Sequence, residues 1–172
     1  KNALYLHPDW LFEYAKTLDL YAEFFEEELY YNKAIETLSH VLMIDPDFPH
    51  IHYQLALVHS HLGELSEELD PFYKALHYFK LAAKHEEEND QILVDLAVTL
   101  INIAQASSDA LEVEICYKDA EAKLIQAVKA GNLQAYYQLA GLFSILRQPE
   151  KSLAFLMKTE SFQALPSIEE IL

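Results

Sequence analysis

The sequence predicts an all-α fold, an α-solenoid of about four helix hairpins with a C-terminal capping helix, in a single domain over residues 1–172. First, a pair of helical patterns recurs four times along the chain. Second, only 3 glycines and 6 prolines occur, too few for an all-β chain with many tight turns. Third, 52% hydrophobic and 23% charged residues are typical of a globular chain and not of a disordered one.

The first helix of each pair is marked by an alanine that directly follows a tyrosine or a leucine. These alanines are Ala22, Ala56, Ala97 and Ala140, at separations of 34, 41 and 43 residues. Bulky residues lie four positions before and three positions after each alanine: Leu18, His52, Leu93 and Tyr136, then Phe25, His59, Leu100 and Phe143. Steps of three and four place these side chains on one face of a helix.

The second helix of each pair has a small residue followed by two further residues, the first four positions later and the second three positions after that. The four sets are Ala34, Leu38 and Val41; Ala75, Phe79 and Ala82; Ala120, Leu124 and Ala127; and the weaker Ser152, Leu156 and Thr159. Small side chains allow another helix to approach closely, so each set predicts a helix packed against its partner.

Capping residues predict where several helices begin and end. Pro8 starts a long first helix, and Asp70, followed by proline, caps the second helix of the second pair. Gly63 is expected to end the helix before it. The segment 107–109 should cap a helix over 110–130 that ends at Gly131.

Two insertions and one terminal element complete the expected organisation. The insertions fall near residues 63–71 and 105–116, one as a longer acidic loop and the other as extra turns on paired helices. Residues 165–172 are expected to begin a capping helix. Because the chain starts at Lys1 without Met, we expect it to be a segment of a larger scaffold.

The recurring pattern resembles the tetratricopeptide repeat (TPR) family over residues 15–166. The copies would span residues 15–48, 49–89, 90–132 and 133–166, and the first copy is the closest to the family pattern. The resemblance implies a right-handed superhelix whose concave groove, lined by the first helix of each pair, binds a peptide or helix of a partner protein. It implies a non-catalytic module with no cofactor and no metal.

Carried over from the family, the lining positions predict the peptide-binding residues. They fall on Lys16, Asp19, Glu23 and Glu26; His50, Tyr53, Leu57 and Ser60; Gln91, Val94, Val98 and Ile101; and Gln134, Tyr137, Gly141 and Ser144. The residues expected to contact the ligand are Asp19, Glu23, Tyr53, Leu57, Val94, Val98, Ile101 and Tyr137. The helix of Val94 is apolar on both faces, so that face is offered to a partner or covered by another part of the chain.

Net charge narrows the class of partner. With 28 acidic and 12 basic residues the formal net charge is −16, which argues against binding nucleic acid or an anionic membrane surface. We therefore expect an apolar or basic protein segment. Some TPR domains clamp the acidic tail of heat-shock chaperones with lysine and asparagine, but Asp19 and Glu23 occupy the matching positions here, so that role is not expected.

Motifs that suggest catalysis or metal binding are weak. The tripeptide His7-Pro8-Asp9 matches the J-domain signature without the basic helix that precedes it there, so helix capping is the simpler interpretation. His52 and His59 share a helix face but lie about 10 Å apart, too far to chelate one ion. The single cysteine, Cys116, excludes an internal disulfide and favours a reducing compartment, so we expect a cytoplasmic protein.

Two other functions remain open at this stage. Small acidic TPR-like proteins resemble the class II chaperones of bacterial type III secretion, which keep apolar secreted subunits in solution. Alternatively, the chain is a self-assembling structural element, a homo-oligomer in which another copy covers the apolar third repeat or the C-terminal end.

Overall fold

The computed structural model describes residues 7–86 and 89–160, with side-chain detail as far as Thr159. Over these residues the chain forms eight helices and no strand, which confirms the all-α prediction. The helices are α1 (Pro8–Phe25), α2 (Glu28–Ile44), α3 (Ile51–Ser66), α4 (Leu69–His85), α5 (Gln91–Ala106), α6 (Ala110–Ala130), α7 (Gln134–Ile145) and α8 (Pro149–Glu160).

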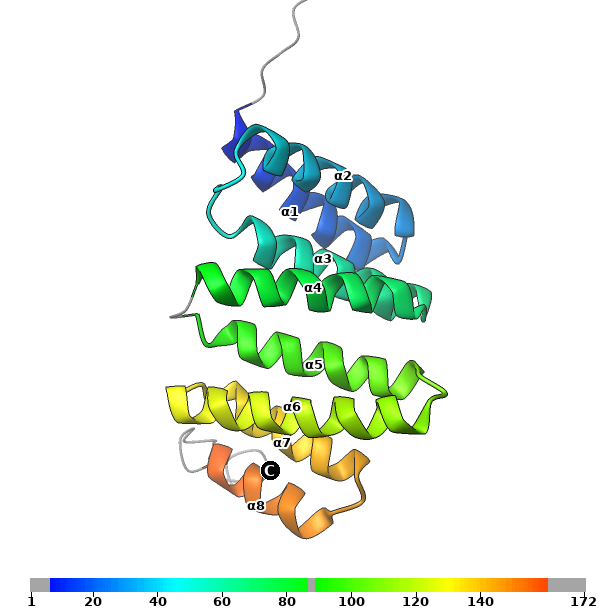
Figure 1. Ribbon diagram of the computed structural model, residues 1–172, viewed down its shortest axis with the longest axis vertical. Coiled ribbons are helices and arrows are strands. Elements are labelled where there is room, and N and C mark those ends of the chain that lie inside the picture. Colours follow the sequence, from blue (N-terminus) through cyan, green and yellow to red (C-terminus); the bar gives the residue numbers. More distant parts are fainter. Residues whose placement is uncertain (1–6, 87–88, 161–172) are drawn as a thin grey trace, which may run out of the picture.

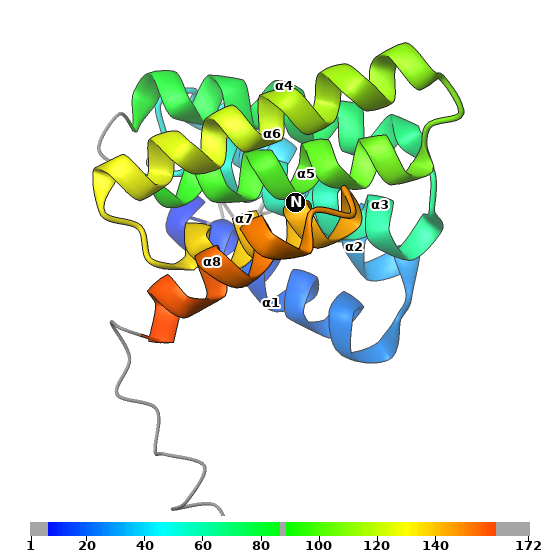
Figure 2. The same cartoon turned by 90° about the horizontal axis from the view of Figure 1, so that it is seen from below.

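The helices pair as antiparallel hairpins that stack in series, with α1 at one end of the array and α8 at the other (Figure 1). Each even-numbered helix packs on the odd-numbered helix that follows it, so neighbouring hairpins share an interface. Consecutive odd-numbered helices also touch one another, whereas the backbones of consecutive even-numbered helices lie farther apart, and the Tyr73 hydroxyl of α4 reaches Glu112 of α6 with a 2.6 Å hydrogen bond. The odd-numbered helices therefore line the inner, concave side of the array. Figure 2 shows α4 and α6 along one side of the molecule, with α3 and α5 next to them and α1 and α8 on the opposite side.

The buried residues follow the predicted spacing. The small and bulky residues of the second-helix pattern in α2, α4 and α6 are fully buried, as are the marker alanines of α1, α3 and α5. These side chains form two core clusters that meet within α3: Leu55 belongs to the N-terminal cluster with α1 and α2, and the adjacent Ala56 belongs to the larger cluster of α4 to α7. No single core spans the array, as expected for stacked hairpins that bury their faces pairwise.

In three of the four hairpin turns, a residue other than glycine adopts a left-handed backbone conformation. Glu26, Glu67 and Arg147 adopt left-handed conformations with φ of 55°, 57° and 56°. The amide of Glu67 donates a hydrogen bond to the carbonyl of Gly63 at 2.9 Å, which satisfies one of the last carbonyls of α3. The α5–α6 turn differs, because an extended segment leads into the cap of α6.

The prediction that Gly63 ends a helix is wrong. Helix α3 continues through Gly63 to Ser66 and α4 begins at Leu69, so of the two expected forms of insertion, residues 63–71 show extra turns on paired helices and not a loop. A Cβ atom at position 63 would lie 2.8 Å from two ring atoms of Phe72 in α4. The glycine is therefore required for close packing between two helices and not for a turn.

The cap of α4 also differs from the prediction. Helix α4 begins at Leu69 with Glu68 in the cap position, so Asp70 lies in the first turn, where its carboxylate pairs with Lys74 at 2.7 Å. The expected limits of α6 are confirmed: the Asp109 carboxylate accepts a hydrogen bond from the Leu111 amide at 2.9 Å, and the helix ends at residue 130. The expected capping helix over 165–172 lies outside the described residues.

Candidate peptide-binding groove

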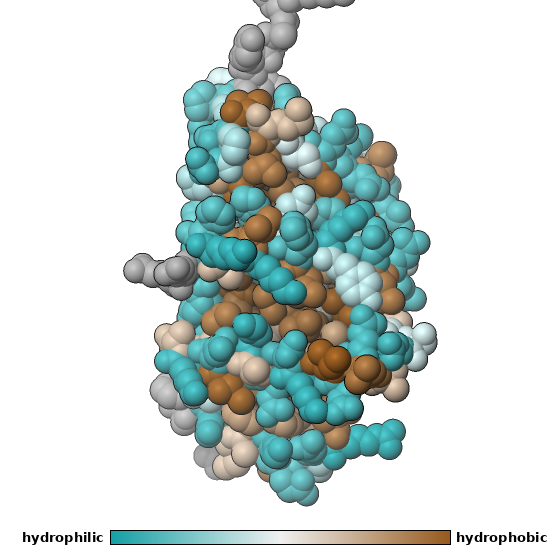
Figure 3. Space-filling view, in the orientation of Figure 1, coloured by the Kyte–Doolittle hydropathy of each residue, from teal (hydrophilic) through white to brown (hydrophobic). Residues whose placement is uncertain are grey.

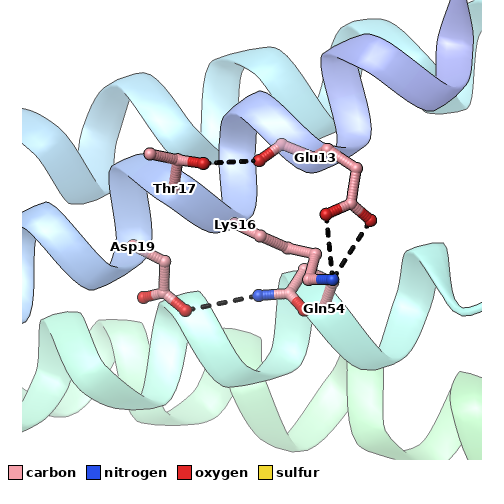
Figure 4. A network of polar contacts seen from close by, with 5 residues as sticks. All are labelled: Glu13, Lys16, Thr17, Asp19 and Gln54. Carbon is pink, nitrogen blue, oxygen red and sulfur yellow. Dashed lines mark hydrogen bonds and ion pairs between the residues drawn. The ribbon is translucent and has the colours of Figure 1, made fainter.

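Polar contacts join the inner faces of α1 and α3. The Asp19 carboxylate, only 7% exposed, contacts Nδ1 of His61 at 2.9 Å through Oδ1. Its other oxygen accepts a hydrogen bond from the Gln54 amide at 3.3 Å. Figure 4 shows Asp19 and Gln54 reaching toward one another between the two helices, while Lys16 pairs with Glu13 on α1 itself at 3.1 Å. Asp19 therefore joins two repeats and has little surface left for a ligand.

The charge around His61 is strongly negative. Burial alone would lower the pKa of His61, but the hydrogen bond and charge of Asp19, together with the charges of Glu64 and Glu23, outweigh burial and raise this pKa. The charges of three carboxylates thus act on one imidazole at this end of the groove, and Asp19 is the one in contact with it. Glu23 and Glu64 are exposed, and both can receive a cation from solution.

A second set of hydrogen bonds joins α3 to α5 and continues to the turn before α7. The Tyr53 hydroxyl donates to the Asp95 carboxylate at 2.6 Å, and Gln91 donates to the same carboxylate at 3.0 Å. Asn132 in turn donates to the Gln91 side-chain oxygen at 3.2 Å. Burial raises the pKa of Asp95 although both hydrogen bonds oppose that shift. The carboxylate of Asp95 is therefore a structural acceptor.

The same inner face carries half-buried apolar side chains. On α5, Val98 lies one helical turn from both Asp95 and Asn102, which bond across to α3. On α3, Leu57 lies one turn from Tyr53 in the same way. Both Leu57 and Val98 are partly exposed, so they form an apolar strip between the polar contacts.

The structure places the eight predicted contact residues at three depths. Val94 is fully buried in the larger core cluster and Ile101 is 8% exposed, so neither offers surface to a ligand in this conformation. The apolar inner face of α5 is covered in part by α3 and α7, which touch it on either side. Asp19 is buried as well, Tyr53, Leu57 and Val98 are half-buried, and Glu23 and Tyr137 are exposed.

The sequence analysis did not predict several residues of the groove. His61, Glu64, Asp95 and Asn102 all lie on the inner face; Asn102 donates to the Glu64 carboxylate at 2.8 Å. The sequence feature that could have identified them is a polar residue within an otherwise apolar helix, such as Asp95 between Val94 and Leu96. A buried polar group needs a hydrogen-bonding partner, so such a residue indicates a contact with the next repeat.

The convex side has a separate apolar cleft. Because the backbones of α4 and α6 lie apart, a cleft of about 670 Å³ opens between them over the leucines of α5, and the hydrogen bond from Tyr73 to Glu112 joins the two helices beside it. Its walls include Leu76 and Ile115, and Lys80, Lys84 and Lys123 also line it. Figure 3 shows apolar surface gathered in the middle of this face with hydrophilic residues around it.

Metal binding and membrane insertion find no support in the described residues. No group of three or more histidine, cysteine, aspartate or glutamate side chains there is arranged to hold a metal ion. None of the helices in residues 7–86 and 89–160 combines the length and apolarity needed to cross a bilayer. His59 is instead a buried packing residue, stacked on Tyr78 with ring centroids 5.7 Å apart.

Comparison with known proteins adds no relative: no family model matches the chain, and no curated protein matches it. The all-α architecture therefore rests on the helices and their contacts. The resemblance to TPR proteins rests on the spacing of residues such as Ala22 and Ala34, and it stays an expectation from the sequence.

Proposed function

We propose that the chain is a non-catalytic protein-interaction module, part of a larger scaffold, whose concave face binds a basic and apolar segment of a partner protein. The observation that supports this most directly is the acidic inner end of the array, where Asp19 contacts His61 at 2.9 Å and the charges of the exposed Glu23 and Glu64 act on the same imidazole. Even a protonated His61 balances only one of these charges, so a lysine or arginine of a ligand would find an unmatched negative charge here.

The apolar part of the proposed site adjoins this acidic end. Leu57 and Val98 are partly exposed between residues that bridge α3 and α5, so a ligand side chain placed there would be held by a rigid frame. Tyr137 on α7 is 42% exposed and extends the same side of the array. Aromatic residues of this kind are common anchors in protein interfaces.

Selection of peptides from a random displayed library against the purified chain tests the proposal. We expect the selected peptides to combine lysine or arginine with large apolar residues. The Val98→Asp variant should bind them at least about tenfold more weakly, since central apolar contacts are commonly worth more than 1 kcal/mol. The Glu23→Gln and Glu64→Gln variants should weaken the dependence of binding on salt.

Ile125→Asp is the matched control, because Ile125 is 37% exposed on the convex helix α6. Circular dichroism establishes that each variant keeps its helices. The proposal fails if the peptides are acidic, or if Val98→Asp and Ile125→Asp bind them equally well.

A further inference from the structure

Helix α1 presents an uncovered aromatic stripe on the outer end of the array. Trp10, Tyr14, Tyr21 and Phe24 are 69%, 54%, 51% and 79% exposed, and with Thr17 they follow one another at steps of four and three. They therefore lie on one face of α1. Tyr30 of α2 contacts only the edge of this face, through Tyr21 at 5.9 Å between ring centroids, and more than half of each aromatic side chain stays exposed. An exposed aromatic patch usually marks an interface.

The internal repeat identifies what normally covers this face. When the marker alanines are aligned, Thr17, Tyr21 and Phe24 correspond to one triplet in each of α3, α5 and α7. The triplets are Ile51, Leu55 and Val58; Ile92, Leu96 and Thr99; and Ala135, Leu139 and Leu142. Every residue of these triplets is no more than 4% exposed. In each case the odd-numbered helix packs on the even-numbered helix before it.

The other end of the array exposes the complementary half of that interface. Leu156 of α8 corresponds to Leu38, Phe79 and Leu124, which are fully buried, yet Leu156 is 38% exposed. Leu153 corresponds to Ile35, Leu76 and Glu121; the two apolar equivalents pack against the core, yet Leu153 is 58% exposed. A hollow of about 410 Å³ beside these leucines offers room for an aromatic side chain.

We propose that the α1 stripe docks on α8 of a second copy of this chain, so that copies stack head to tail and continue the inter-repeat interface already made three times within one chain. The contact is heterologous, because different surfaces of the two copies meet, and it is open-ended.

Charge favours this arrangement over pairing of two α1 stripes. Residues 8–44 carry eight acidic and two basic side chains, whereas residues 134–172 carry four acidic and three basic ones. Head-to-tail stacking brings the acidic end against a nearly neutral end, whereas pairing of two α1 stripes would bring two strongly negative ends together.

Sedimentation equilibrium of the whole chain tests the proposal across a dilution series up to millimolar concentration. We expect the average mass of the wild type to rise with concentration, and the Phe24→Asp and Leu153→Asp variants each to lose that rise. Both residues are exposed, so neither substitution disturbs the core, and circular dichroism verifies the helices. Met43→Asp, at a position 82% exposed on α2, should behave as the wild type.

A mixture of the two variants gives the sharpest result. Phe24→Asp keeps an intact α8 face and Leu153→Asp keeps an intact α1 face, so the equimolar mixture should recover association but stop at twice the 19.8 kDa of one chain. A wild type that stays monomeric overturns the proposal. So does association that Phe24→Asp abolishes and Leu153→Asp leaves intact, because that result means that two α1 stripes pair.

Discussion

Substituting Gly63 with alanine tests the packing between α3 and α4. The new Cβ atom would lie 2.8 Å from Cδ1 and Cε1 and 2.9 Å from Cγ of Phe72. Carbon atoms in favourable contact are about 3.5–4.0 Å apart, so the ring has to move by more than half an ångström. Phe72 is 3% exposed and cannot move into solvent. Overpacking costs about 1–3 kcal/mol, and removing glycine from a helix interior returns up to about 1 kcal/mol.

We therefore expect Gly63→Ala to lower the free energy of unfolding by about 1–2 kcal/mol, as measured by urea titration with circular dichroism. Gly141→Ala is the control, because no heavy atom lies within 4 Å of its added Cβ in α7. That variant should be more stable than the wild type by up to about 1 kcal/mol. In the Phe72→Leu background, Gly63→Ala should cost less, because the shorter side chain relieves the contact. A Gly63→Ala chain as stable as the wild type would refute the steric argument.

Two further predictions concern local interactions. Burial lowers the pKa of His59 to about 4, from about 6.5 in the unfolded chain, so the folded state loses stability as pH falls from 6.5 toward 4, by at most about 3 kcal/mol. Urea titrations across this pH range should show a smaller loss for His59→Phe; identical pH profiles would contradict the assignment. Asp109→Ala removes the side-chain cap of α6 and should cost about 1 kcal/mol by the same assay, whereas Asp109→Asn should retain most of that stability.

Local signals in the sequence were sufficient for most of the architecture. Alanines such as Ala56 set the helix pairing because a small side chain at a fixed spacing lets the neighbouring helix approach. The limits of α6 were predictable because an aspartate at its start and Gly131 at its end act within one turn of chain. These features need no knowledge of the distant residues that pack against them.

The remaining features depend on distant parts of the chain. Gly63 looks like a helix end until Phe72, nine residues later, is seen against it. Glu26 and Glu67 adopt left-handed conformations, which glutamate does not signal, because the closing hairpins impose them. Val94 was expected to face a ligand, yet it is buried because α3 and α7 approach α5 from both sides. The neighbouring helices decide which face of an apolar helix is covered.

The division of the core within α3 determines how the two ends of the molecule communicate. Leu55 and Ala56 are adjacent, yet their side chains belong to different clusters, and Tyr78 of α4 packs against both clusters. The N-terminal hairpin and the later hairpins are therefore joined through α3 and through Tyr78. Any effect of a ligand at one end of the array on the other end has to pass through these contacts.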